Sequence, residues 1–183
     1  MNVEEYRKWQ HTTIWGASLK VIPPLGQYDE TRLINYGTNR WAFKPEFGYS
    51  RRWGHWILDA YGGAWFFTTN PEFFSHNQYV PGTTKQSENP TGSLEAHLSY
   101  DVRRRLWFSL DANFWSGGAT SLNGVQNPST VQRNSRVGAT ASVPLTSHQS
   151  IKISYSNGAY VAYGGNYQNI SAAWQYSWLG RPN

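Results

Sequence analysis

Acid-base chemistry would be easiest to build around His97. Glu95 precedes it by two positions, and Asp111 lies on the next predicted strand. With Ser99 or Ser109 as the nucleophile, these are the residue types of a Ser/His/acid hydrolase. No nucleophile elbow or other local hydrolase signature accompanies them in the sequence. We therefore interpret His97 as a polar residue of the protein interior and expect no enzymatic activity.

Metal and cofactor chemistry has little support in the sequence. Glu95, His97 and Asp111 are side chains of the kind that bind metals, but three residues on paired strands are a weak pattern. The sequence contains no Cys, which excludes thiolate zinc sites and disulfides. Residues 16–26 contain no phosphate-binding loop. We predict no bound metal and no cofactor.

The composition is unusual for a soluble domain. Of the 183 residues, 16% are aromatic, including 10 Trp and 12 Tyr, and only 15% are charged. A typical soluble domain is about 25% charged. The 17 Gly and 9 Pro residues supply many turns. Because this length suits one domain with a substantial buried surface, we treat the chain as one unit.

The formal net charge of +5 does not by itself indicate a nucleic-acid partner. Basic residues are scattered along the chain except for Arg51-Arg52 and Arg103-Arg104-Arg105. A nucleic-acid-binding domain is expected to gather such residues on one face. We interpret the two clusters as solvated turns, with an anion-binding patch as the alternative. We expect no nucleic acid among the partners.

Alternation of apolar and polar residues with a period of two runs through the whole sequence and predicts an all-β fold. In residues 40–50 the odd positions are apolar, and the even positions are charged or small. Six such segments are clear: 40–50, 93–102, 106–115, 136–145, 151–156 and 170–178. Two less regular segments, 13–21 and 56–66, bring the predicted count to eight strands.

The connections alternate between short and long. They are short at 50–56, 102–106 and 145–151, and long at 22–38, 68–92, 117–133 and 159–168. This order is typical of antiparallel up-and-down barrels of the outer membrane, which have short periplasmic turns and long external loops. The sequence therefore predicts a transmembrane β-barrel with eight strands in this chain.

The positions of Trp and Tyr favour a membrane barrel over a soluble one, which would place apolar residues inside and charges outside. The aromatic residues gather at both ends of the predicted strands, as in the girdles of membrane barrels. At the short-turn ends they are Trp53, Trp56, Trp107, Trp174, Tyr176 and Trp178, and at the long-loop ends Trp41, Trp65, Trp115 and Tyr160. Predicted strands of about 9–11 residues also match a tilted crossing of the hydrocarbon layer.

The polar face of the strands is expected to point into the lumen. The residues predicted to line the lumen or a substrate path are Arg40, Lys44, Glu46, Asp59, Tyr61, Glu95, His97, Asp111, Asn113, Arg136 and Lys152. In a closed eight-stranded barrel the interior is just wide enough for side chains to fill, so these residues would form a polar plug. A polar passage or binding site is the alternative if the barrel is wider.

The hairpin that turns at the Arg triplet has a predicted register. A three-residue turn places His97 opposite Asp111 on the polar face and Val102 opposite Leu106 on the apolar face. The neighbouring register would place Glu95 opposite Asp111, and two like charges directly opposite each other are destabilising. We therefore predict the register that pairs His97 with Asp111.

We expect this barrel in the outer membrane of a Gram-negative bacterium, with lipid, lipopolysaccharide and the assembly machinery as partners. No stretch approaches the roughly 20 apolar residues of a membrane-spanning helix. The first residues, MNVEEYRKWQH, have no apolar core and no cleavage site, so any export signal is expected outside this chain. We divide the chain into a periplasmic segment or strand remnant (1–11), the barrel (12–178) and a periplasmic tail (179–183).

Several stretches resemble the family of outer-membrane transporters associated with the meta-pathway of phenol degradation. They are GASLKVIPPLGQYDETRLINYGTNRWAFKPEFGYS, WILDAYGGAWFFTTNPEFF, GSLEAHLSY, RLWFSLDANFWSGG, RNSRVGATASVPL and the closing WQYSW. The resemblance extends from about Thr12 to Trp178. It includes no catalytic motif.

The resemblance implies a porin-like barrel linked by gene context to the uptake of hydrocarbons or aromatic compounds, without identifying a substrate. Members of the family look longer, with further strands ahead of the segment that matches EEYRKWQHTTIWGASL, so an N-terminally shortened form is expected. We predict a channel or uptake protein for small hydrophobic or aromatic compounds. A non-transporting structural or adhesive barrel is the alternative.

Overall fold

The computed structural model describes residues 13–103 and 105–178, which form eleven β-strands and one short 3-10 helix. In chain order these are β1 (Ile14–Ile22), β2 (Ala42–Trp53), β3 (Trp56–Phe67), β4 (Gln86–Glu88), β5 (Thr91–Arg103), β6 (Leu106–Gly117), β7 (Thr120–Leu122), β8 (Val125–Asn127), η1 (Pro128–Thr130), β9 (Gln132–Pro144), β10 (Gln149–Val161) and β11 (Asn169–Tyr176). The predicted segments 1–11 and 179–183 lie outside the described residues.

The strands form two antiparallel sheets. The large sheet has eight strands in the order β1-β2-β3-β5-β6-β9-β10-β11, and the small sheet has the order β4-β7-β8. The predicted count of eight strands is therefore wrong for the chain, although the strands of the large sheet fall on the predicted segments. The three additional strands have three residues each, which is too short for alternation to be visible in the sequence.

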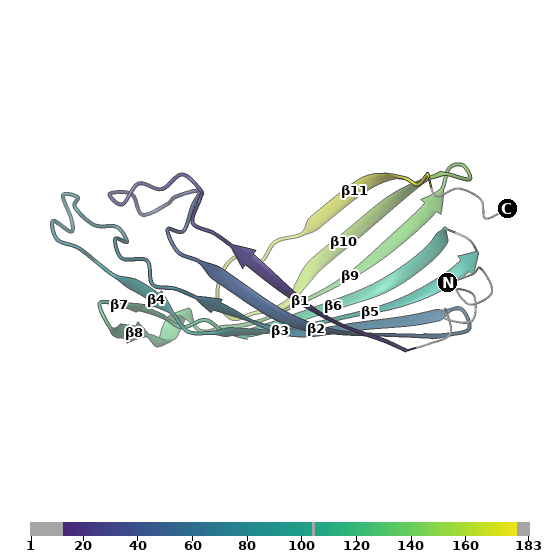
Figure 1. Cartoon of the computed structure of the whole chain (residues 1–183), viewed down its shortest axis with the longest axis horizontal. Helices are drawn as coiled ribbons and strands as arrows, with labels where there is room; N and C mark the ends of the chain where they lie inside the picture. Colours follow the sequence, from purple (N-terminus) through teal and green to yellow (C-terminus); the bar gives the residue numbers. More distant parts are fainter. Residues whose placement is uncertain (1–12, 104, 179–183) are drawn as a thin grey trace.

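The large sheet is open in the described residues, where β1 and β11 each have a single neighbour. Figure 1 shows the sheet bending so that β9, β10 and β11 rise away from β2, β3 and β5 without coming round to β1. The structure thus does not show the closed barrel that we predicted. Alternation fixes which face of each strand is apolar, but it carries no information on whether the first and last strands meet.

The two faces of the large sheet have opposite chemistry. Large apolar side chains on one face are exposed, with Leu94 at 60% and Leu110 at 67% exposure, whereas Ser109 and Ser142 on the other face are 6% and 1% exposed. Among the described residues, Ala42 and Ala119 are the buried apolar ones. This arrangement is the reverse of a soluble β-domain, in which the apolar face would be covered. None of the described residues forms a helix long and apolar enough to cross a membrane.

The connections of the large sheet alternate as predicted. The short turns that follow β2, β5 and β9 lie at one end of the molecule, and the long loops with β4, β7 and β8 lie at the other (Figure 1). The turn between β2 and β3 has Gly54 with a φ of 60°, a left-handed conformation that glycine adopts without strain. Neighbouring strands are therefore joined by tight turns at one end of the sheet and by long loops, some with short strands, at the other.

The register of β5 and β6 confirms the predicted pairing of His97 with Asp111. The predicted pairing of Val102 with Leu106 is wrong, because Leu106 pairs with Arg103 and the register shifts at this end of the hairpin. A β-bulge adds one residue to one strand only, and it therefore changes the pairing beyond it. Near the turn, Arg105 adopts a φ of 65°.

The long loops are tied to one another at their end of the sheet. The small sheet joins the loop after β3, which contains β4, to the loop after β6, which contains β7 and β8. The loop before β2 joins them through the Tyr28 hydroxyl, which donates a hydrogen bond of 2.9 Å to the backbone oxygen of Glu72. These loops therefore form a structured border beside the polar face.

Candidate functional site

The predicted lumen residues lie on the polar face, with the exception of Arg40. Lys44 and Glu46 are on β2, Asp59 and Tyr61 on β3, Glu95 and His97 on β5, Asp111 and Asn113 on β6, Arg136 on β9 and Lys152 on β10. Arg40 lies in the loop before β2 and not on a strand as predicted, yet its side chain still reaches Glu88 on β4.

Cross-strand pairing arranges many of these residues in two rows across the sheet. One row joins Asp59, His97 and Asp111 on β3, β5 and β6. The adjacent row contains Tyr61, Glu95, Asn113 and Arg136 on β3, β5, β6 and β9. Residues that are up to 75 positions apart in the sequence thereby become neighbours on one face.

The carboxylate of Asp111 is the centre of a hydrogen-bond network. Its Oδ1 lies 2.7 Å from His97 Nδ1 and accepts a bond of 2.9 Å from Ser109 Oγ, while its Oδ2 accepts a bond of 2.7 Å from Thr140 Oγ1. A hydrolase triad needs the serine hydroxyl to bond to the histidine ring. Here Ser109 and His97 share the carboxylate, so the relay of a triad is not assembled.

The second candidate nucleophile, Ser99, pairs with Ser109 across β5 and β6. Neither serine has a hydrogen bond to His97 in the described part of the chain. The same part of the chain contains no group of three His, Cys, Asp or Glu side chains placed to hold a metal ion. The arrangement around His97 is therefore that of a hydrogen-bonded polar cluster.

Lys44 links two neighbouring acidic residues over the polar face. Its Nζ lies 3.0 Å from Glu95 Oε1 and also forms an ion pair with Glu46. Since β3 separates β2 from β5, the Lys44–Glu95 pair reaches over a whole strand. Lys44 is buried, and burying a charge is tolerated when it is paired and hydrogen-bonded. The burial of Lys44, Ser109 and Ser142 indicates that the polar face lies on the inside of the curved sheet.

Arg40 forms a second buried ion pair near the long loops. Its Nη2 lies 2.5 Å from Glu88 Oε2, and its guanidinium carbon lies 4.4 Å from the centroid of the Phe67 ring. The other terminal nitrogen, Nη1, is buried and has no hydrogen-bond partner among the described residues, and the same is true of Thr91 Oγ1. Two buried polar atoms near the long loops thus lack a hydrogen-bond partner in the part of the chain that the structure describes.

Arg136 is held by backbone oxygens and an aromatic ring. Its Nη2 donates to the backbone oxygen of Tyr167 at 2.9 Å and to that of Ser156 at 3.3 Å. Its guanidinium carbon lies 4.0 Å from the centroid of the Tyr167 ring, which is a cation-π distance. No carboxylate of the described residues forms an ion pair with it.

A hollow of about 580 Å³ lies on the polar face next to the long loops. We call it the polar-face hollow. Its aromatic walls are Trp65, Phe67, Trp115 and Tyr167, and its charged lining residues are Arg40, Lys44, Arg136, Glu88 and Glu95. The volume lies within the range of about 300–1,000 Å³ that is usual for small-molecule sites. Aromatic rings beside cationic groups give the hollow a mixed lining.

The sequence prediction missed several parts of this hollow. Glu88 lies on a three-residue strand that alternation did not reveal. Trp65 and Trp115 were assigned to the long-loop girdle, but they line the polar-face hollow. Trp107 was assigned to the short-turn girdle, but it lies beneath Lys152 Nζ at 5.7 Å from the ring centroid. All three Trp residues have odd numbers, as the polar side chains of β3 and β6 do. The sequence therefore already indicated that they lie on the polar face.

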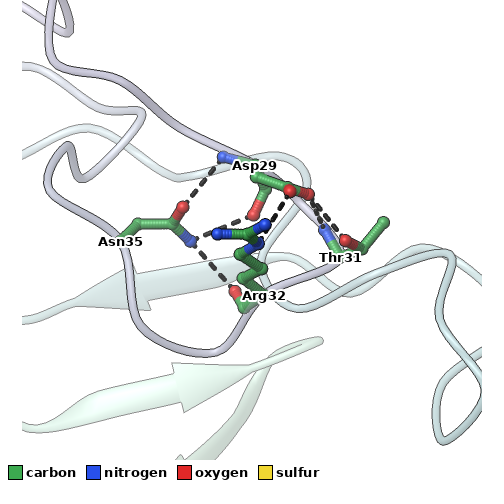
Figure 2. Close-up of polar contacts among 4 residues, drawn as sticks. All are labelled: Asp29, Thr31, Arg32 and Asn35. Atoms are coloured by element: carbon green, nitrogen blue, oxygen red, sulfur yellow. Dashed lines mark hydrogen bonds and ion pairs between the residues drawn. The ribbon is translucent and has the colours of Figure 1, made fainter.

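The loop before β2 contains a separate polar cluster, drawn in Figure 2. Asp29 accepts hydrogen bonds from the hydroxyl and the backbone N–H of Thr31, at 2.6 and 3.0 Å, and pairs with Arg32 Nε at 3.1 Å. The Asn35 side chain accepts a bond from the Asp29 N–H and donates to the Asp29 and Arg32 backbone oxygens. The Thr31 bonds, aided by Arg32, hold the pKa of Asp29 below its ordinary value. This cluster closes the loop on itself.

Sequence comparison identifies the family. The family described as "Putative MetA-pathway of phenol degradation" matches residues 6–162. The chain belongs to this family. No curated protein matches the sequence at a significant level. The match spans β1 to β10 and includes the residues that line the polar-face hollow except Tyr167.

The fold of this family member is similar to a solved structure, the crystal structure of an outer membrane channel from Pseudomonas putida F1. The TM-score is 0.76 and the sequence identity is 19%. The similar region covers 90% of this chain and 59% of the channel chain. The likeness therefore concerns the fold, and this chain spans about three fifths of the length of that protein.

Proposed function

We propose that the chain forms the wall of an outer-membrane β-barrel channel for small hydrophobic or aromatic compounds. The observation that carries this proposal is the reversed distribution of side chains, with an exposed apolar face and a buried polar face that contains a hollow. An exposed apolar face suits lipid, and a polar face suits an aqueous lumen. Family membership and the fold of the Pseudomonas putida channel support the same reading.

Aromatic residues on the apolar face support the location in a membrane. Trp56 packs against Tyr100 at a centroid distance of 4.9 Å, and Trp174 lies 6.1 Å from Tyr176. These four residues lie near the short turns and are exposed. Amphipathic rings prefer the membrane interface, so this cluster fits the girdle on the periplasmic side. Outer-membrane lipid, lipopolysaccharide and the assembly machinery are the partners in this proposal.

The free edges of the sheet must be paired in a bilayer. In a bilayer, the unpaired N–H and C=O groups along β1 and β11 would each cost several kcal/mol. These edges therefore need further pairing when the protein is in lipid.

Planar-bilayer recording of the purified protein tests the channel function. We expect discrete single-channel currents, since a lumen that holds charged side chains also admits water and ions. Uptake of a labelled aromatic compound by proteoliposomes would extend the result to organic solutes. Protein that inserts into the bilayer without conductance would contradict the proposal.

A non-transporting structural or adhesive barrel is the second candidate. The ion pairs Lys44–Glu95, Arg40–Glu88 and Arg52–Asp101 favour it, because a lumen filled with paired charges can act as a polar plug. The bilayer experiment separates the two functions. A plugged barrel would insert and remain silent.

A further inference from the structure

We propose that the polar-face hollow binds aromatic compounds that carry an anionic oxygen group, such as aromatic carboxylates. The inference rests on the proposed channel function and names the class of solute that the channel would select. It is based on three features of the hollow: hydrogen-bond donors and a cation that lack an acceptor or a carboxylate partner among the described residues, and aromatic walls.

The unpartnered donors come from Arg40 and Thr91. The Arg40 side chain is only 12% exposed, yet its Nη1 has no acceptor among the described residues. Thr91 is 5% exposed, and its hydroxyl also has no partner there. A buried donor left without an acceptor costs about 1–3 kcal/mol, and more for a charged group. A ligand oxygen that enters the hollow would remove this cost.

The charge balance of the hollow favours an anion. Glu88 is engaged by Arg40, and Glu95 is engaged by Lys44, which is also paired with Glu46, so Arg136 is the cation that carries the argument. Arg136 bonds only to neutral oxygen atoms, so its positive charge is not neutralised by a carboxylate of the described residues. The guanidinium group is well suited to bind a carboxylate through two parallel hydrogen bonds.

The walls favour an aromatic ring on the same ligand. Trp65 and Phe67 lie nearly parallel, at 9° and a centroid distance of 6.3 Å, and Trp115 and Tyr167 complete the aromatic lining. Flat rings gain free energy by offset or edge contacts with such walls. A ligand with an aromatic ring and an anionic oxygen group therefore matches both parts of the lining.

Isothermal titration calorimetry of the detergent-solubilised protein tests the proposal with three ligands. Benzoate has the ring and the anion, benzamide is its neutral isostere, and cyclohexanecarboxylate has the anion without the aromatic ring. We expect benzoate to bind roughly tenfold more tightly than benzamide, which corresponds to one charged hydrogen bond. We expect cyclohexanecarboxylate to bind more weakly than benzoate. Equal affinities for benzoate and benzamide would overturn the proposal.

Matched variants locate the site. Arg136→Gln removes the cation without a carboxylate partner among the described residues and should abolish the preference for benzoate. Arg40→Gln combined with Glu88→Gln leaves the net charge unchanged, removes the unpartnered Arg40 donor and should reduce the preference. Glu88→Gln alone removes a carboxylate and should strengthen benzoate binding. Arg133→Gln, at an exposed position adjacent to the hollow-lining Gln132, is the charge control and should retain the preference. Unchanged selectivity in Arg136→Gln, in protein that migrates in unheated gel samples like the native protein, would place the anion elsewhere and contradict the assignment.

The outcomes also distinguish this inference from the channel function. Benzoate selectivity in a protein that shows no conductance would leave the binding site in place and refute the channel. Conductance without any difference between benzoate and benzamide would support the channel and refute the anion site.

Discussion

His97 on β5 lies directly opposite Asp111 on β6, with its Nδ1 2.7 Å from the Asp111 Oδ1. The contact places an imidazole beside a carboxylate at the middle of the polar face. Ser109 and Thr140 also donate to Asp111, so both oxygens of the carboxylate are occupied. The hydrogen bonds therefore fix the register of the hairpin and satisfy the charge that this face would otherwise leave unpaired.

The pairing of His97 with Asp111 predicts that cysteines introduced at these two positions form a disulfide. Cα atoms of directly opposite residues in antiparallel strands are about 4.5–5.5 Å apart, which is within disulfide range. The chain has no native Cys, so His97→Cys with Asp111→Cys should cross-link readily under mild oxidation. The shift of the band in a non-reducing gel measures the reaction.

Glu95→Cys with Asp111→Cys is the matched control, because Glu95 pairs with Asn113 and not with Asp111. It should cross-link poorly. A faster reaction in the control than in the His97 and Asp111 pair would show that the register differs from the one described.

The alternation of β5 and β6 made this part of the fold predictable. Charge repulsion selected the register, because the competing one places Glu95 beside Asp111. The bulge at Val102 was not predictable in this way, since a single inserted residue leaves the alternation on either side intact. Whether the first and last strands of the sheet pair could not be predicted from alternation either, because this pairing depends on the curvature of the whole sheet.

The candidate site was predictable only in part. Lys44 and Glu95 were assigned to the polar face by parity, and the structure joins them. Their contact was not foreseen, since it passes over a strand between them. Glu88 was missed because its strand is too short to show alternation, although it closes the ion pair with Arg40.

A glycine comparison tests the close packing of β2 and β3. A Cβ at Gly63 would lie 2.7 Å from the backbone oxygen of Pro45, which cannot move without shifting the strand. Gly63→Ala should therefore destabilise the protein by about 1–3 kcal/mol, as expected for overpacking. Urea unfolding in detergent measures the difference.

Gly16 provides the control for this substitution. A Cβ at Gly16 would meet no atom within 4 Å, so Gly16→Ala should be nearly neutral. Equal destabilisation by the two substitutions would contradict the close approach of β2 and β3 at Gly63.

A charge on the apolar face should be far more costly than one on the polar face. Leu110 is 67% exposed on the face assigned to lipid. Leu110→Arg is expected to cost about 2–4 kcal/mol if the position lies near the bilayer midplane. Ser99→Arg, on the polar face, can hydrate and should cost much less. Folding yields into lipid vesicles measure both variants, and equal losses would count against the assignment of the two faces.

The Asp29 cluster predicts an acid-sensitive loop. The pKa of Asp29 is lowered by the Thr31 hydrogen bonds, so its contribution to loop stability is present above the unfolded pKa and is lost as pH falls through the lower folded pKa. The Thr31 amide resonance should titrate with a midpoint below 3.8, the ordinary value for Asp. Asp29→Asn should remove this transition. A midpoint at or above 3.8 in the native protein would refute the bonding shown in Figure 2.

Cysteine accessibility along β5 in lipid vesicles tests the membrane-wall assignment most directly. Single cysteines would replace the consecutive residues Leu94, Glu95, Ala96, His97, Leu98 and Ser99, and a charged, water-soluble thiol reagent would label them. The structure predicts labelling at the odd positions, which face an aqueous lumen, and protection at the even positions, which face lipid. Labelling of the even positions with protection of the odd ones, or labelling without alternation, would contradict a membrane wall with a polar inner face.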